Sequence, residues 1–187
     1  LRNLVSQANS QEQPSPLSWD ALNNLMQNIN GDYFDYDSFK AVYDAPTASG
    51  SASITAISED ATASGNLIST LFSGNFSDTT DAVTGGSSAH TMAAIAIVLY
   101  SADASKGEWA YSSTSAGTYT AISSVSGVTS CVVIPSTYYL KFTPALNWNG
   151  SAPSLTVRFI DSSVSVATVS SSINLTTAYA STAYTST

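Results

Sequence analysis

The sequence predicts a mainly β protein, an antiparallel β-sandwich with a small helical segment at its N-terminal end. Polar and apolar residues alternate through residues 107–161, as they do in half-buried strands. Turn sequences such as Ala116-Gly117 and Asn149-Gly150 separate these runs at spacings too short for an intervening helix. The continuous apolar run 93–100 predicts a central strand that is covered on both faces. Together these patterns favour one antiparallel sheet packed on another.

The first part of the chain predicts short helices rather than strands. Leu22, Leu25 and Met26 share one face of a helix that Ser18 can cap. Helices this short cannot bury a core of their own, so we expect them to dock on the β domain or on a neighbour. The predicted organisation is a helical appendage or linker at 1–46, a Ser-rich linker at 47–53 and a β-sandwich domain at 54–187.

The β domain is expected to open with a strand at 53–58, where Ile54 and Ile57 supply the apolar side chains. A helical turn follows at 67–72, and the buried strand at 93–100 comes next. Four later runs alternate as strands do; their apolar residues are Trp109 and Tyr111, Tyr119 and Ala121, Leu140 and Phe142, and Leu155, Val157 and Phe159. We expect Trp109 to lie in the core, as a central-strand Trp commonly does in sandwiches.

The last two groups of predicted strands differ in burial. Cys131 begins an apolar run, 131–134, that reads as a buried strand with an inert thiol. As the only cysteine, it excludes a disulfide within the chain. After Asp161 the alternation is weaker and predicts edge strands, whose open backbone groups can pair with another chain.

Composition limits the class of partner. Charged residues make up only 10% of the chain, and the net charge is −8 with five Lys and Arg residues. Binding to nucleic acid or to an anionic membrane needs clustered cations, so we expect neither. No apolar stretch approaches the length of a membrane-spanning helix, which argues against membrane insertion. An excess of acids instead favours divalent cations.

Several motifs resemble, in order, the Ig-like or cadherin-like repeat modules of large bacterial RTX-type surface adhesins. They are ITAISEDATASGNLISTLFSGNFSDTTDAVTGGSSA, GEWAYSSTSAGTYTAI and LKFTPALNWNGSAPSLTVRFIDSS, which lie between about Ile54 and Asp161. In such modules an acidic pair follows the first strand, and an Asp ends the strand after an Asn-Gly hairpin. The chain departs from the pattern at Thr114–Gly117, where the family commonly has Asp-Gly-Gly. One more apolar strand would be expected beyond Thr187, so the chain is either a fragment or receives that strand from a neighbouring subunit.

The resemblance implies an extracellular, cell-surface protein with a structural or adhesive role. It would act either as a repeat of a giant adhesin or as the subunit of a self-assembling surface filament, and its partners would be copies of itself or neighbouring repeats. Calcium would be the structural cofactor. Its ligands, carried over by position, would be Glu59, Asp60, Asp78, Asp81 and Asp161. Oxygen ligands drawn from loops at one end of a sandwich suit Ca²⁺.

Two other classes of function were weighed against this one. A Ser-His-Asp triad would have to use His90, the only histidine, in a Ser/Gly-rich loop without a G-x-S-x-G motif. Carboxylates for glycoside hydrolysis could come from Glu59, Asp60 or Glu108, but nothing places them across a sugar cleft, so we do not expect an enzyme. A calcium loop at 28–39 fails because Phe39 stands where a bidentate Glu is needed. The alternative function is a carbohydrate-binding module for surface glycans, in which Trp148 and Asn149 in the Asn-Gly turn contact the sugar.

Overall fold

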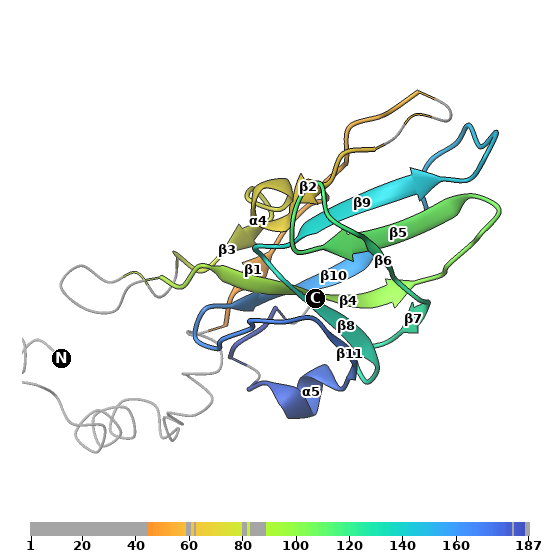
Figure 1. Cartoon of the computed structure of the whole chain (residues 1–187). Helices are drawn as coiled ribbons and strands as arrows, with labels where there is room; N and C mark the ends of the chain where they lie inside the picture. The colour runs from red at the N-terminus through yellow and green to blue at the C-terminus, as the bar shows by residue number, and fades with distance from the viewer. Residues whose placement is uncertain are drawn as a thin grey trace, which may run out of the picture. The chain divides into compact units, whose positions relative to one another are not determined.

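The computed structural model describes residues 45–58, 61, 63–79, 82, 89–180 and 182–185, which belong to one compact unit (Figure 1). The predicted helical appendage, 1–46, lies almost wholly outside these residues, so its helices stay a prediction. The predicted linker contains the first short strand of the described unit. None of the described helices is long and apolar enough to span a membrane.

The fold is mainly β and all of its strand pairs are antiparallel, which confirms the predicted fold class at this level. The largest sheet has the order β10–β4–β8–β11, and β7 also pairs with β4. Its strands are β10 (Thr156–Asp161), β4 (Met92–Tyr100), β8 (Cys131–Pro135), β11 (Ser170–Ile173) and β7 (Val125–Ser126).

A second sheet has the order β2–β9–β5–β6, and a third consists of β1 and β3 alone. The second contains β2 (Asn66–Leu67), β9 (Tyr139–Pro144), β5 (Gly107–Ser112) and β6 (Thr120–Ala121), and the third contains β1 (Thr47–Ala48) and β3 (Phe76–Ser77). Two short helices, α4 (Ile68–Leu71) and α5 (Leu175–Ala178), are described as well. The helical turn predicted at 67–72 is therefore confirmed.

The hydrophobic core joins side chains of the two larger sheets. β4 lies between β10 and β8, and its Ile95 and Ile97 are fully buried, which confirms the predicted central strand. Trp109 of β5 lies in the same core, as expected, and its ring centroid is 5.5 Å from that of Phe142. Burying a large apolar side chain of this kind contributes about 1.5–3 kcal/mol. The alternation visible in the sequence is thus the pattern that builds this core.

Gly107 is required where β5 begins. Its φ is +128°, a conformation that side chains rarely adopt. A Cβ there would also lie 2.2 Å from the backbone oxygen of Thr143 on the neighbouring strand. Only glycine therefore lets β5 approach β9 at this point.

Cys131 and the C-terminal strand follow the prediction in part. The thiol is fully buried and donates a hydrogen bond to the carbonyl of Ile173 at 3.1 Å, and burial raises its pKa. β11 is an edge strand of its sheet, as expected. The short helix α5 was not predicted. It begins because Asn174 caps it, accepting a hydrogen bond from the Thr176 N–H at 3.1 Å.

The strand predicted at 53–58 is wrong. These residues form no strand, and their backbone makes no ladder hydrogen bond within the described residues. Small Ser, Ala and Thr side chains bury too little apolar surface to hold the segment in a sheet, and Ile57 remains 39% exposed. The segment instead forms one wall of a groove.

Candidate functional site

Two features of the structure could bind a ligand or a partner: the buried side chains of Asp78 and Asp161, and a groove. Asp78 follows β3 and Asp161 ends β10, so these two predicted calcium ligands come from separate elements of the fold. Asp161 is completely buried and Asp78 is 4% exposed. Burial, and in addition the nearby negative charge of Asp161, raise the pKa of Asp78.

Each of these carboxylates is fixed through one of its oxygens. Asp161 Oδ1 accepts hydrogen bonds from the backbone N–H of Ser163, at 2.8 Å, and from the Ser163 hydroxyl. Asp78 Oδ2 accepts one from the backbone N–H of His90 at 2.7 Å, and the His90 Nδ1 lies 3.4 Å from the same oxygen. These contacts hold the two side chains in place from the loops that follow β10 and precede β4.

The other oxygen of each carboxylate is buried and accepts no hydrogen bond. These atoms are Asp78 Oδ1 and Asp161 Oδ2. Leaving a buried polar atom unsatisfied costs about 1–3 kcal/mol, and more when the group is charged. A proton, a water molecule or a cation could each satisfy such an oxygen.

The remaining predicted calcium ligands are not placed by the structure. Glu59, Asp60 and Asp81 lie outside the described residues. Within the described part of the chain, no group of three or more His, Cys, Asp or Glu side chains could hold a metal ion. Asp78 and Asp161 are therefore the two predicted calcium ligands whose positions the structure describes, and calcium binding stays a prediction.

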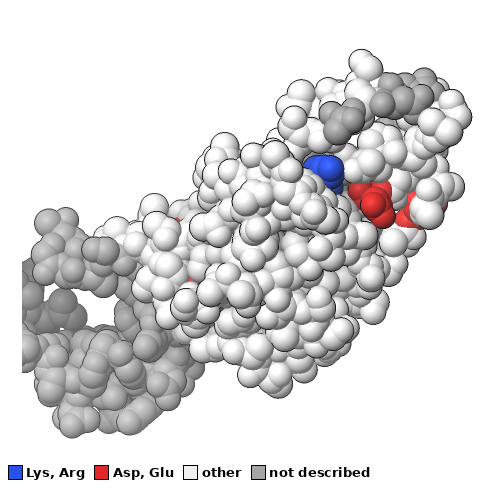
Figure 2. All heavy atoms as spheres, viewed as in Figure 1, with Lys and Arg blue, Asp and Glu red and all other residues white. Residues whose placement is uncertain are grey.

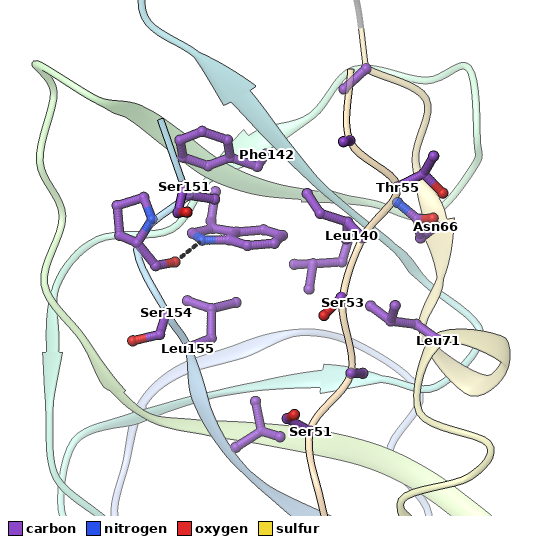
Figure 3. Close-up of a pocket in the computed structure, with 18 of the residues that line it drawn as sticks. Ser51, Ser53, Thr55, Asn66, Leu71, Leu140, Phe142, Ser151, Ser154 and Leu155 are labelled. Carbon is purple, nitrogen blue, oxygen red and sulfur yellow. Dashed lines mark hydrogen bonds between the residues drawn. The ribbon is translucent and has the colours of Figure 1, made fainter. Parts of the chain in front are cut away.

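A groove of about 1310 Å³ opens beside β10 (Figure 3). One wall carries Ser51, Ser53 and Thr55, and the segment bearing Ser154 and Leu155 faces it across the cavity, as Figure 3 shows. Core side chains from the second sheet and from α4 line it between these walls, among them Leu140, Phe142 and Leu71. None of the described residues that line the groove is charged.

The backbone along both walls is unpaired. No backbone hydrogen bond within the described residues involves 50–57 or 149–155. The Trp109 indole N–H donates to the carbonyl of Pro153 at 2.6 Å and so ties one wall to the core. Extended segments with open donors and acceptors behave as edge strands do.

The outer edge of β10 is covered over only half its length. At the covered end, the Phe159 N–H donates to the Thr185 hydroxyl at 3.1 Å, and the Thr185 N–H donates to the Phe159 carbonyl at 3.0 Å. Tyr184 also bridges to Ile160. On that outer side, no strand or bridge pairs with residues 156–158 within the described residues. The groove therefore continues an open strand edge.

The two residues predicted to bind a ligand, Trp148 and Asn149, both line this groove. Asn149 is exposed, whereas Trp148 is half-buried and its indole nitrogen has no hydrogen-bond partner. The Lys106 ammonium lies 6.0 Å from the Trp148 ring centroid, at the limit of a cation–π contact. Sequence reasoning missed the groove itself. The available signal was the Ser- and Ala-rich composition of 47–58, which was interpreted as a linker and a strand.

Comparison with known proteins found no related protein. No family model matches the chain, and neither a curated protein nor a solved structure matches it. The function must therefore be inferred from the groove and the aspartate pair.

Proposed function

We propose that this chain is a non-enzymatic, extracellular structural and adhesive module, an Ig-like β-sandwich that joins neighbouring copies or neighbouring repeats through an open strand edge. The observation that carries the proposal is the groove beside β10. Its two extended walls have no backbone partners within the described residues, and they face each other over an uncharged, partly apolar floor. Such a groove suits an extended segment from another chain.

Strand addition would use both kinds of contact that the groove offers. Backbone groups along 50–57 and 149–157 would pair with those of the incoming strand, each hydrogen bond contributing about 0.5–1.5 kcal/mol net. Every second side chain of the incoming strand would point to the apolar floor near Leu140 and Phe142. The completed pairing would remove the open edge and extend the sheet that ends at β10.

The surface composition also favours contact between copies. Figure 2 shows a face on which charged side chains gather at one end, while most of the described surface carries neither Lys, Arg, Asp nor Glu. Close approach of identical surfaces is opposed mainly by like charges. A surface with few charged side chains allows such an approach, which supports the structural role.

The proposal is tested by light scattering of the purified chain over a range of concentrations. The variants Ser53→Lys and Thr156→Lys place a charge at exposed positions on the two sides of the groove. Lysine on an edge strand opposes strand addition. Thr129→Lys, at an exposed turn position between β7 and β8, is the matched control.

We expect the unchanged chain and Thr129→Lys to assemble with rising concentration, and both groove variants to remain monomeric. Assembly that persists in the two groove variants would show that the interface lies elsewhere. A chain that stays monomeric at every concentration would remove the assembly function altogether.

A carbohydrate-binding module is the second candidate, and the position of Trp148 and Asn149 favours it. Both residues line an uncharged groove whose rim carries several hydroxyl groups, an environment that suits a neutral glycan. The test is binding to a panel of immobilised glycans, with Trp148→Ala as the variant. Binding that Trp148→Ala abolishes would support this function, and absence of binding to every glycan would remove it.

A further inference from the structure

We propose that Asn149 is a modification site, at which the side-chain amide reacts with the backbone nitrogen of Gly150 and is converted into aspartate or isoaspartate. The conversion itself does not depend on the proposed assembly function. Its consequence, closure of the groove to an incoming strand, rests on that function. The observation that carries the proposal is an exposed Asn-Gly pair on an unpaired wall of the groove.

The reaction uses groups that the chain itself supplies. The backbone nitrogen of Gly150, after loss of its proton to solvent, attacks the side-chain carbonyl carbon of Asn149. A nitrogen–carbon bond forms, and the side-chain nitrogen leaves as ammonia. Water then opens the five-membered imide ring at one of its two carbonyl carbons. One opening gives aspartate, and the other gives isoaspartate, in which the main chain passes through the former side chain. Only water is consumed.

The local structure leaves both reacting groups accessible. Asn149, Gly150 and Ser151 are all exposed. No hydrogen bond within the described residues involves the Asn149 side chain or the Gly150 N–H. Glycine has no Cβ to hinder the attack, and its backbone is freer than that of any other residue. The amide and the nitrogen can therefore reach the geometry that ring closure requires.

Asn174 shows how the fold prevents the same reaction elsewhere. Its side chain caps α5, where it accepts hydrogen bonds from the N–H of Thr176 at 3.1 Å and from the Thr176 hydroxyl at 2.7 Å. The nitrogen that would attack it belongs to Leu175 and donates to the carbonyl of Val128 at 2.8 Å. Both reacting groups are therefore engaged.

Asn75 is held in a comparable way. Its side chain donates to the carbonyl of Ser49 at 2.7 Å, and the next residue, Phe76, begins β3. A large side chain at the following position also hinders the attack. Asn75 and Asn174 are therefore internal controls for Asn149 in the same chain.

Conversion would change the wall of the groove in two ways. Aspartate would place a negative charge in a groove whose described lining residues are uncharged, and a charge on a strand edge opposes strand addition. Isoaspartate would lengthen the main chain by one carbon and shift the register of the backbone groups that follow, at 150–155. Both products would weaken pairing along this wall, so an aged chain would lose its capacity to accept a strand.

The experiment is peptide mapping of the whole chain by mass spectrometry after increasing times at neutral and at mildly alkaline pH. Trypsin releases the peptide 142–158, and its fragment ions locate the mass gain of an amide-to-acid change. We expect conversion at Asn149, faster at alkaline pH because the attacking nitrogen must lose a proton, before any is detected at Asn75 or Asn174. Conversion at Asn149 that is no faster than at these two residues would overturn the proposal.

Asn149→Gln is the matched variant, because its amide would have to close a larger and less favourable ring. Gly150→Ala is less suitable, since a Cβ at this position would lie 2.5 Å from the Trp148 ring and displace it. Light scattering compares each chain with its own fresh sample. We expect ageing to abolish assembly of the unchanged chain and to leave Asn149→Gln as it was when fresh. The variant also separates Asn149 from the other Asn-Gly pair of the sequence, Asn30-Gly31.

The outcomes distinguish the modification from the assembly function. Conversion at Asn149 without any change in assembly would overturn its effect on the groove. An equal loss of assembly in aged Asn149→Gln would do the same, because another site would then be responsible. A fresh chain that never assembles would remove the proposed assembly function and its regulation, whereas the mass measurement would still decide whether Asn149 is modified.

Discussion

The side of the core built by β4 and β8 and the side beside the first half of β10 differ in how completely the backbone is paired. Ile95, Val133 and Ile134 lie on the first side, where each strand has a neighbour and the side chains are fully buried. On the second side, residues 50–57 and 149–155 run along the groove without backbone partners in the described structure. Stability is therefore concentrated on the closed side, whereas contacts with other molecules are available on the open side.

This comparison shows how one chain can be stable and still offer a strand edge. The closed side holds large aliphatic side chains that are buried in one hydrophobic cluster. The wall at 50–57 on the open side holds mainly Ser, Ala and Thr, which bury little apolar surface. The open edge is tolerated because the fold does not depend on it for its core.

The largest expected effect distinguishes the two sides by stability. Ile134→Ala removes a fully buried side chain of β8 and should lower the free energy of unfolding by about 2–5 kcal/mol. Ile54→Ala removes a half-buried side chain of the groove wall and should cost less than about 1 kcal/mol. Denaturant unfolding measures both values. Equal losses would mean that the groove wall contributes to the fold as much as the core strand does.

A smaller effect is expected where the two sides are connected. Trp109→Phe removes the indole N–H that donates to the Pro153 carbonyl, while an aromatic ring stays in the core. We expect a loss of about 1–3 kcal/mol in the free energy of unfolding, measured by denaturant unfolding. Tyr111→Phe, on the same strand, is the control. Equal unfolding free energies for Trp109→Phe and the unchanged chain would show that this wall is held by other contacts.

The smallest effect on stability is expected from a comparison of thiol reactivity on the two sides. Cys131 is fully buried on the closed side, and burial raises its pKa above the usual 9.0, which disfavours the reactive thiolate. We expect the native chain to resist a thiol reagent, even as the pH rises towards 9.0. The thiol introduced by Ser53→Cys on the open side should react rapidly. Rapid reaction of Cys131 in the folded chain would contradict the closed character of its side.

Strand positions in the core were predictable from the sequence because buried strands carry continuous or alternating apolar side chains. The apolar run of β4, the alternation of Trp109 and Tyr111 in β5, and Leu140 and Phe142 in β9 all occur where they were expected. In each case the local pattern and the tertiary packing agree.

The predictions of secondary structure were wrong where the local sequence pattern does not determine how a segment packs against its neighbours. Residues 53–58 alternate as a strand would, yet no neighbouring strand pairs with them in the described structure. Asn174 starts α5 in a stretch whose weak alternation had indicated only strands. Pairing depends on what lies beside a segment, and one sequence window does not contain that information.

The candidate sites were predictable to different degrees. Asp78 and Asp161 were proposed as calcium ligands through a family resemblance; the structure shows that both are buried, and cation binding stays a prediction. Their open oxygens and the groove could not be seen in the sequence, because both depend on how distant segments approach each other. The roles of Trp148 and Asn149 likewise stay predictions.

The most direct test of the open edge is backbone hydrogen exchange of 50–57 and 149–155, measured at low and at high protein concentration. An open edge predicts fast exchange in the dilute chain and strong protection once copies assemble, while β8 stays protected throughout. Protection that is the same at both concentrations would contradict the account, because the edge would then take part in no assembly.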